Sequence, residues 1–249
     1  MFKLTLSDAD LLKNSIPIIS EIIDEGVFKV DENGISLVSP DRAMVAVVDM
    51  KILPTAFDEY KCEGEELLGL NLSNLSAVIK RAKSGDKIIL EKEKDDNKLT
   101  ITIKGEGTRK FVLPLLDIKT EKPPIDKLAF TGRLEIESKI IEESIADADI
   151  ISDAVIFEAD GNAFRIEAKG DVSSVKMELT KEDKGLLDLK VDGTIRAQYP
   201  LEYLKKMIKA SKISEQMTIE FGTDYPMRMG FKSIDKMQLS FILAPRVES

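Results

Sequence analysis

Apolar residues recur at helical spacing in two segments of the chain. In residues 70–83 the apolar stripe consists of Leu72, Leu75, Val78, Ile79 and Ala82. In residues 199–212 it consists of Leu201, Leu204, Met207 and Ile208. Because residues three and four apart share a helix face, the spacing predicts two amphipathic helices. Their other faces are basic: the first segment has three basic residues and no acid, and the second has four lysines and one acid.

The same spacing predicts two further helices. A stripe of Leu12, Ile16, Ile19 and Ile23 predicts a helix that Ser7 caps, with Asp10 at its third position. Pro17 lies inside this stripe and removes a backbone donor, so the helix is expected to be kinked or shortened. The fourth predicted helix covers 137–148, with a stripe of Ile140, Ile141, Ser144, Ile145 and Ala148.

Between the helices the apolar residues alternate at period two, which is typical of strands. The runs 27–30 and 35–38 flank Asn33-Gly34, and the runs 155–159 and 163–168 flank Asp160-Gly161-Asn162, so each pair predicts a hairpin. Further strands are predicted at 2–6, 44–50, 60–62, 69–72, 87–92, 99–104, 109–113, 130–136, 172–180, 186–191, 193–198, 218–221, 227–232 and 237–243.

The order of predicted elements repeats once along the chain. Gly34 and Asn71 have counterparts 127 positions later, at Gly161 and Gln198. Each half contains a strand, a helix and three strands, followed by the same series again. This spacing predicts two domains of one topology rather than a solenoid. The domains are expected at 1–118 and 129–249, joined by a polar connecting loop at 119–128 that contains Pro123-Pro124.

Charge changes the interpretation of the two basic helices. The chain carries 36 Lys and Arg against 45 Asp and Glu, a formal net charge of −9. Two basic helices on an acidic protein favour a surface that faces nucleic acid. The alternative is that lysine only keeps two surface helices soluble.

The composition also excludes several kinds of chemistry. Histidine is absent, which excludes His-based acid–base catalysis, His-dependent nucleophiles and His-containing metal sites. Cys62 is the only cysteine, so an internal disulfide is excluded and a reducing compartment is favoured. No run approaches the roughly 18 apolar residues of a membrane helix, and the first residues lack a signal-peptide core.

Six short motifs, in this order, resemble the sliding clamps of the proliferating cell nuclear antigen family, archaeal type. They are Met1-Phe2, Leu37-Val38-Ser39-Pro40-Asp41 with Val45, Gly69-Leu70-Asn71-Leu72, Pro114-Leu115-Leu116-Asp117, Ser152-Asp153-Ala154-Val155, and Leu243-Ala244-Pro245-Arg246-Val247-Glu248. The resemblance implies an α+β DNA-clamp fold, with two similar clamp domains that are each built from two βαβββ units. Helices would cover one face of antiparallel sheets.

The resemblance implies a processivity factor without enzymatic activity or cofactor. Three copies would form a ring around double-stranded DNA without reading its sequence. The expected partners, which bind through short clamp-binding peptides, are DNA polymerase, clamp loader, flap endonuclease and DNA ligase. The expected location is cytoplasmic, associated with the nucleoid, or nuclear in a eukaryotic source. The open alternatives are one subunit of a heterotrimeric clamp, a carboxylate-metal hydrolase using Asp41, Asp49 and Asp117, and an acidic scaffold that does not bind DNA.

The DNA-facing residues are expected to be Lys13, Lys80, Lys139, Lys205, Lys209 and Lys212. Lysines that do not seat on fixed phosphates attract DNA weakly and in a salt-dependent manner. Residues 137–149 are rich in acid, so part of that helix must face something other than DNA.

The resemblance places the trimer interface where the edge strand 108–113 pairs with the edge strand 173–180 of a neighbour. The predicted interface residues are Arg81, Lys83, Arg109, Lys110, Glu143, Asp147, Val175 and Met177. Arg81, Lys83 and Arg109 would supply the positive side of an ion-pair network, with Glu143 and Asp147 opposite. Lys139 stands where the pattern has a further acid, so the network is expected to be thinner. The alternative is that these charges are only solvated.

The resemblance also implies a groove for partner peptides under the connecting loop. The predicted lining is Pro40, Met44, Val45, Pro226, Ile242, Ala244 and Pro245, with Ile125 as a lip. Met44 and Ile242 stand where some members have a histidine and a tyrosine, so the lining is more aliphatic. Glu121 and Pro123 depart from the often apolar pattern of the loop. The alternative for Met44 and Val45 is an ordinary strand core.

Overall fold

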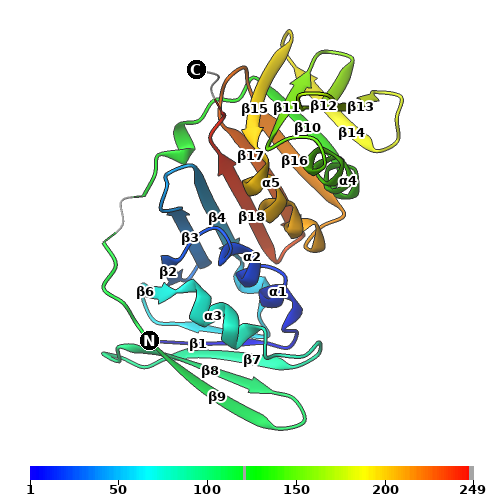
Figure 1. Cartoon of the computed structure of the whole chain (residues 1–249). Coiled ribbons are helices and arrows are strands. Elements are labelled where there is room, and N and C mark those ends of the chain that lie inside the picture. Colours follow the sequence, from blue (N-terminus) through cyan, green and yellow to red (C-terminus); the bar gives the residue numbers. More distant parts are fainter. Residues whose placement is uncertain (120–121, 247–249) are drawn as a thin grey trace. The chain divides into compact units, whose positions relative to one another are not determined.

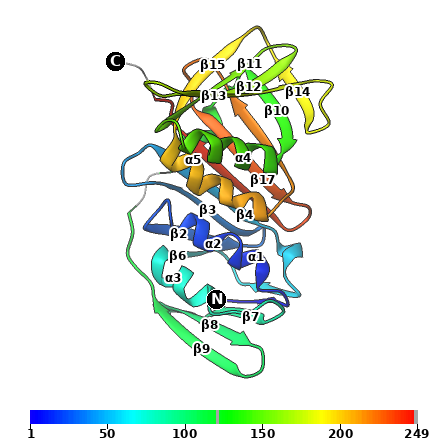
Figure 2. The ribbon, with the colours of Figure 1, turned by 45° about the vertical axis from the view of Figure 1, so that its right-hand side comes forward.

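The computed structural model describes residues 1–119 and 122–246 (Figures 1 and 2). Glu121 of the predicted loop and the C-terminal Val247 and Glu248 lie outside the described residues. The chain separates into two compact units. Unit 1 comprises Met1–Pro123 and Ser233–Leu239, and unit 2 comprises Pro124–Lys232 and Ser240–Ser249. The predicted domain limits at 118 and 129 stay predictions.

Unit 1 contains two sheets and three short α-helices. Its helices are α1 (Asp10–Lys13), α2 (Ile16–Ile19) and α3 (Leu72–Ile79), with a 3-10 turn at Pro54–Ala56. Its strands are β1 (Phe2–Leu6), β2 (Glu25–Asp31), β3 (Gly34–Pro40), β4 (Ala46–Ile52), β5 (Glu59–Cys62), β6 (Glu66–Asn71), β7 (Lys87–Lys92), β8 (Lys98–Lys104) and β9 (Thr108–Pro114). One sheet is five-stranded, in the order β5-β1-β7-β8-β9, and the strands of the other follow the order β4-β3-β2-β6.

Unit 2 repeats this arrangement. Its helices are α4 (Ser138–Asp149) and α5 (Leu201–Met207), with 3-10 segments at Ile125–Lys127 and Ile208–Lys212. Its strands are β10 (Gly132–Glu137), β11 (Ala154–Ala159), β12 (Ala163–Lys169), β13 (Ser174–Thr180), β14 (Leu186–Val191), β15 (Ile195–Pro200), β16 (Gln216–Phe221), β17 (Met227–Ser233) and β18 (Met237–Leu243). The last residue of β17 and the first three of β18 belong to unit 1. The strand orders are β14-β10-β16-β17-β18 and β13-β12-β11-β15. Each unit therefore has two strand–helix–three-strand series separated by one extra strand, β5 or β14, which confirms the predicted repeat.

Buried apolar side chains hold the helices against the sheets. Leu72, Leu75, Val78 and Ile79 of α3 are buried, as are Leu201, Leu204 and Met207 of α5. Both predicted apolar stripes are confirmed. The helix pair α1–α2 is separated at residues 14–15, and Pro17 lies in the first turn of α2, where its missing N–H costs nothing. The shortening predicted from Pro17 is thus confirmed.

The prediction that Ser7 caps the first helix is wrong. α1 begins at Asp10 with Ala9 in the cap position and no side-chain cap bond. Asp8 accepts a bond of 2.9 Å from the Asp10 amide, while the Ser7 hydroxyl donates to Asp58 at 2.9 Å. The acid next to Ser7 therefore satisfies the free amide, and Ser7 instead ties the end of β1 to the segment before β5.

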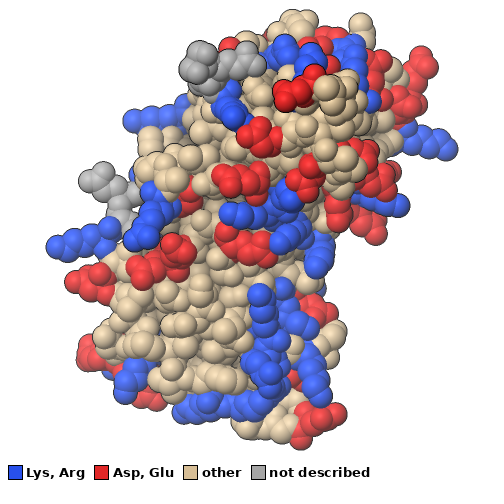
Figure 3. All heavy atoms as spheres, in the orientation of Figure 1, with Lys and Arg blue, Asp and Glu red and all other residues tan. Residues whose placement is uncertain are grey.

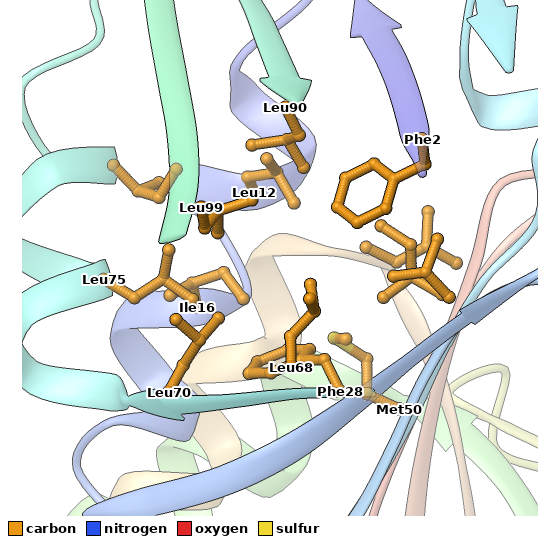
Figure 4. Close-up of a pocket in the computed structure, with 14 residues that line it drawn as sticks. Phe2, Leu12, Ile16, Phe28, Met50, Leu68, Leu70, Leu75, Leu90 and Leu99 are labelled. Carbon is orange, nitrogen blue, oxygen red and sulfur yellow. The ribbon is translucent and has the colours of Figure 1, made fainter. Parts of the chain in front are cut away.

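A small apolar cavity remains in the core of unit 1 (Figure 4). It has a volume of about 40 Å³ and is lined only by apolar side chains, among them Phe2, Leu68 and Leu90. The volume would admit one water molecule, but the cavity offers that water no hydrogen-bond partner, so it stays dry. At about 24 cal/mol per Å³, the void costs about 1 kcal/mol of stability. It is a packing defect and not a ligand site.

The core of unit 2 is organised around aromatic rings. Phe157 makes edge-to-face contacts with Phe164, Tyr199 and Phe221 at centroid distances of 5.7, 5.8 and 6.3 Å. The Tyr199 ring is fully buried, and its hydroxyl donates to the Tyr225 carbonyl at 2.7 Å. Burial raises the pKa of Tyr199, so it remains a neutral donor. This bond satisfies the one polar atom that the ring brings into the core.

The two equivalent hairpins use glycine differently. Gly34 opens β3 with a φ of +118°, and a Cβ there would lie 2.0 Å from the Ile52 carbonyl oxygen. Gly161 has no such φ, and a Cβ added there would meet no atom within 4 Å. What recurs is an aspartate: Asp31 accepts from the Asn33 amide and Asp160 from the Asn162 amide, both at 2.7 Å. The local Asp turn, rather than the glycine, is the shared signal.

An ion-pair cluster covers the hairpin β11–β12 and the edge strand β13. The Arg165 guanidinium binds Asp160 at 2.7 Å, Glu158 at 3.4 Å and the Glu178 carboxylate. The hydrogen bond from Arg165, together with backbone donors, lowers the pKa of Asp160 to about 2. The same guanidinium lowers the pKa of Glu178. The cluster joins three strands through one side chain.

Replacing Gly34 with alanine is expected to lower the free energy of unfolding by about 1–3 kcal/mol, because the backbone there is left-handed and in contact with the Ile52 carbonyl. Gly161→Ala is the matched control and should leave stability unchanged or raise it by about 0.4–1 kcal/mol. Urea unfolding at a fixed protein concentration measures both. Equal effects of the two substitutions would contradict the distinction between the hairpins.

Replacing Arg165 with methionine is expected to destabilise the protein by about 1 kcal/mol at neutral pH. The folded-state pKa of Asp160 lies below its ordinary value, so the stabilisation is present above about pH 4 and is lost as the pH falls toward about 2. The wild-type and variant unfolding curves should therefore converge over this interval. Lys169→Met, which removes an exposed cation from the same strand, is the control. A difference that stays constant from pH 7 to pH 2 would refute this assignment.

Candidate nucleic-acid interface, strand edges and partner surface

The helices of unit 2 carry both signs of charge where they meet. α4 and α5 lie side by side in both ribbon views, with the 3-10 segment 208–212 continuing α5 (Figures 1 and 2). The Lys205 ammonium of α5 lies 2.6 Å from the Asp149 carboxylate at the end of α4. The Ser211 hydroxyl donates to Glu142 of α4 at 3.2 Å. The basic helix is thus paired with an acidic one along its length.

The lysines predicted to face DNA in unit 2 are all exposed. Lys139 lies 3.6 Å from Glu143, four residues later on α4. Lys209 and Lys212 belong to the 3-10 segment rather than to the α-helix. Lys206, which the sequence pattern did not single out, lies 5.3 Å from the Tyr203 ring centre in a cation–π arrangement. Basic and acidic side chains are interspersed over the helices of unit 2 (Figure 3).

In unit 1 the basic residues flank the helix instead of lying on it. α3 ends at Ile79, with Lys80 as its C-cap, so Lys80, Arg81 and Lys83 follow the last turn. The prediction of a basic helix face here is therefore wrong in its extent. Cations in this position interact favourably with the negative end of the helix dipole. Lys13 of α1 is partly covered and lies 3.4 Å from Asp10.

β9 and β13 are end strands of their sheets, as are β5, β6, β14 and β15. β9 pairs with β8 alone, and β13 pairs with β12 alone, among the residues that the structure describes. Along both strands exposed residues alternate with half-buried ones, and no residue is fully buried. Val175 and Met177 are in the half-buried row of β13, and Lys110 is in the exposed row of β9. Each strand thus presents unpaired backbone groups beside a partly covered apolar row.

Three of the charged residues predicted for the subunit interface, Lys83, Arg109 and Glu143, form ion pairs within the chain. The Arg109 guanidinium of β9 binds the buried Asp86 carboxylate at 2.9 Å and the Arg81 carbonyl at 3.0 Å. Lys83 lies 3.5 Å from Glu106. Arg81 and Asp147 are exposed, and Glu143 is the partner of Lys139. Asp86, which sequence reasoning missed, fixes the orientation of Arg109.

In unit 1 the predicted partner surface is a tight turn between β3 and β4. The Asp41 carboxylate accepts from the Val45 and Ala46 amides, both at 2.8 Å, and the Met44 amide donates to the Asp41 carbonyl at 3.1 Å. Met44 has a φ of +59° and is 71% exposed. The prediction of a strand from Met44 is wrong, since β4 begins at Ala46, and Met44 does not belong to a strand core. Pro40, the last residue of β3, and Val45 are half-buried.

In unit 2 the predicted lining is mostly covered. Ile125, the predicted lip, is 4% exposed, and its carbonyl accepts from the Arg228 guanidinium at 3.1 Å. Its role in a partner groove stays a prediction. Ile242 is also buried, in β18. Pro226, Ala244 and Pro245 are half-buried. The Arg246 amide donates to the Gln198 carbonyl at 2.7 Å and holds the segment after β18 against β15.

The part of the chain that the structure describes has neither a metal cluster nor a membrane-spanning helix. No group of three or more Cys, Asp or Glu side chains among the described residues could hold a metal ion, and Asp41 instead caps its own turn. No helix in the same residues is long and apolar enough to cross a bilayer.

Comparison with known proteins gives the same organisation. Residues 1–122 match the family described as proliferating cell nuclear antigen, N-terminal domain, and residues 125–246 match its C-terminal domain. The chain belongs to the proliferating cell nuclear antigen family. Among curated relatives, the DNA polymerase sliding clamps of Pyrococcus abyssi and Pyrococcus furiosus are 36% and 35% identical over 247 residues, with 99% of each chain covered. The predicted resemblance is confirmed.

Solved structures of family members have the same fold. The crystal structure of the Thermococcus kodakaraensis protein aligns with a TM-score of 0.92 at 28% identity, covering 99% of this chain and 100% of that one. The Entamoeba histolytica protein aligns with a TM-score of 0.90 at 24% identity, covering 99% of each chain. The predicted α+β clamp fold is thereby confirmed.

Proposed function

We propose that this chain is a DNA polymerase sliding clamp that closes as a trimer around duplex DNA. The observation that carries the proposal is the pair of open strand edges, β9 in one unit and β13 in the other. Unpaired strand edges bind further strands, and two different edges on one chain let identical copies join head to tail. A heterologous contact of this kind gives a closed ring when its rotation closes. The archaeal relatives are named DNA polymerase sliding clamps, which supports the proposed function.

The role proposed for the lysines is a weak and mobile grip on the phosphate backbone. Lys13, Lys80, Lys139, Lys205, Lys209 and Lys212 are the residues proposed to face DNA. These lysines lie among acidic side chains. Their contacts with DNA phosphates carry no sequence information and depend strongly on salt. Such contacts let the ring move along the duplex.

The proposed action of the ring is to raise effective concentration, not to catalyse a reaction. An enzyme tethered to the ring rebinds its template instead of diffusing away. DNA polymerase, a clamp loader, flap endonuclease and DNA ligase are the partners proposed, each through a short peptide. The turn at Asp41–Val45 supports this role because it holds an exposed methionine, an adaptable apolar contact, in a fixed position. Work on chromosomal DNA would place the protein in the cytoplasm, at the nucleoid.

One observation favours a second assembly, a ring of different sister chains. Arg109, Lys83 and Glu143 each have a partner within their own chain, so fewer charges remain for pairs between identical copies. Light scattering on the purified protein distinguishes the two assemblies. A homotrimer gives a mass of about three times 27.7 kDa, whereas a monomer that trimerises only when a sister chain is added supports the mixed ring.

A proline scan of residues 109–112 on β9 is expected to give two alternating classes. Successive residues of an edge strand direct their N–H groups alternately to the neighbouring strand and to the open side. Proline at the open-side positions should not disturb the folding of the monomer. It should raise the protein concentration at which half of the trimer has dissociated by about tenfold or more. Proline at the alternate positions should lower the melting temperature. Proline on β5, at the other end of the same sheet, is the control. Open-side variants that trimerise like the wild type would count against pairing through β9.

Met44→Ala is expected to weaken binding of a clamp-binding peptide about tenfold, because a side chain that is now 71% exposed would be buried against the peptide. Asp41→Ala should weaken the same binding by loosening the turn. Ile234→Ala, which removes an equally exposed apolar side chain elsewhere, should bind as the wild type does. Calorimetric titration with a peptide from a polymerase C-terminus measures all three. Unchanged binding by Met44→Ala would remove this turn from the proposed partner surface.

A further inference from the structure

The carboxylates of α4 are sorted into distinct directions. Glu142 and Asp149 are seven residues apart and so share one side of the helix. That side faces α5 and the 3-10 segment that continues it. Glu142 accepts a hydrogen bond from the Ser211 hydroxyl, and Asp149 forms an ion pair with Lys205. The exposed row Lys139, Glu143, Ala146 and Ile150 lies between this side and Asp147. The acidic residues of α4 therefore do not form one uniform face, and two of them are directed at the basic helix.

Lys205 is the α5 cation that this arrangement restrains most directly. Its ammonium lies 2.6 Å from the Asp149 carboxylate, and the two side chains are 48% and 43% exposed. An ion pair this exposed contributes little to the stability of the fold, so the stability of the fold does not account for it. It does fix where the Lys205 charge lies when no phosphate is near. The carboxylate also repels any phosphate that approaches the same position.

We propose that Asp149 is a positioning residue that limits how strongly the helices of unit 2 hold DNA, by competing with phosphate for Lys205. The inference rests on the proposed clamp function. Lys205 exchanges between the carboxylate and passing phosphates, so each phosphate contact replaces an ion pair instead of adding a new one. The interaction energy of Lys205 then varies little as the protein moves along the duplex. Because this energy is nearly constant, the protein slides without preferring any one phosphate.

The test uses the full-length assembled protein and a fluorescent duplex, with the dissociation constant measured over a series of salt concentrations. Asp149→Asn should tighten binding about three- to tenfold at low salt. It should also steepen the slope of log affinity against log salt by about 0.9 for each further phosphate contact that the freed lysines of the assembly make. The double variant Asp149→Asn with Lys205→Gln should lose this gain, because the freed lysine is then absent.

Glu142→Gln is the matched control. It makes the same change in net charge on the same side of the same helix, but Glu142 binds the Ser211 hydroxyl rather than Lys205, so DNA binding should change less than about twofold. Light scattering confirms that each variant assembles as the wild type does. Single-molecule tracking on long DNA should show slower diffusion for Asp149→Asn alone.

Three results would overturn the inference. One is a wild-type affinity in Asp149→Asn, and another is an equal gain in Glu142→Gln, which would show a general effect of charge. The third is a gain that survives in the double variant. In each of these cases a salt-dependent wild-type affinity would leave the clamp function intact. A wild-type protein that binds no duplex even at low salt would instead overturn the proposed function together with the inference.

Discussion

The constraint on which this structure depends is that backbone N–H and C=O groups must find partners. Within each unit the antiparallel ladders meet it, and the Asp turns meet it locally, with Asp31, Asp41 and Asp160 accepting amides that no strand can reach. At the outer side of an end strand no further strand of the same chain meets it, and β9 and β13 are two such strands. Half-buried apolar residues run along both strands, so docking a strand there would bury apolar surface and satisfy backbone groups together. Assembly through these two edges, as proposed, would therefore continue the same sheet-forming interaction that folds each unit.

Duplication explains why one short chain has two such edges and two pairs of helices. Each unit repeats the strand–helix–three-strand series twice, so equivalent residues occur in pairs. The pairs have diverged in ways that the backbone permits. Gly34 is held by a left-handed φ and by the Ile52 carbonyl, whereas Gly161 is under neither restraint. The two basic segments have diverged as well: α5 carries Lys205 and Lys206 on its last turn, while the basic residues of the α3 segment all follow the end of that helix.

Periodicity and the position of Pro17 were enough to predict the buried faces of α3 and α5, the hairpins, the repeat, and the shortening of the first helix, because these features depend on side-chain spacing and on proline alone. It failed where tertiary contacts decide. The strand predicted from Met44 gives way to a turn because Asp41 accepts two amides beyond it. Ile125 is covered although it lies in a polar, proline-containing segment, and Arg109 is bound to Asp86, which is 23 positions away in the sequence. The seven-residue spacing of Glu142 and Asp149 was available as a signal, but only the structure shows which helix faces them.

The interspersed charge on α4 and α5 resolves the apparent conflict between a net charge of −9 and a role on DNA. A uniformly basic surface would bind phosphate through many additive contacts, and affinity would rise steeply with each one. Such a surface would hold the duplex in preferred positions. Pairing lysines with carboxylates of the same molecule keeps the number of uncompensated cations low while leaving them near the surface. Since exposed pairs exchange partners at little cost, the lysines remain available to phosphate without being committed to it. An acidic protein with a few restrained lysines is therefore better suited to move along DNA than a strongly basic one.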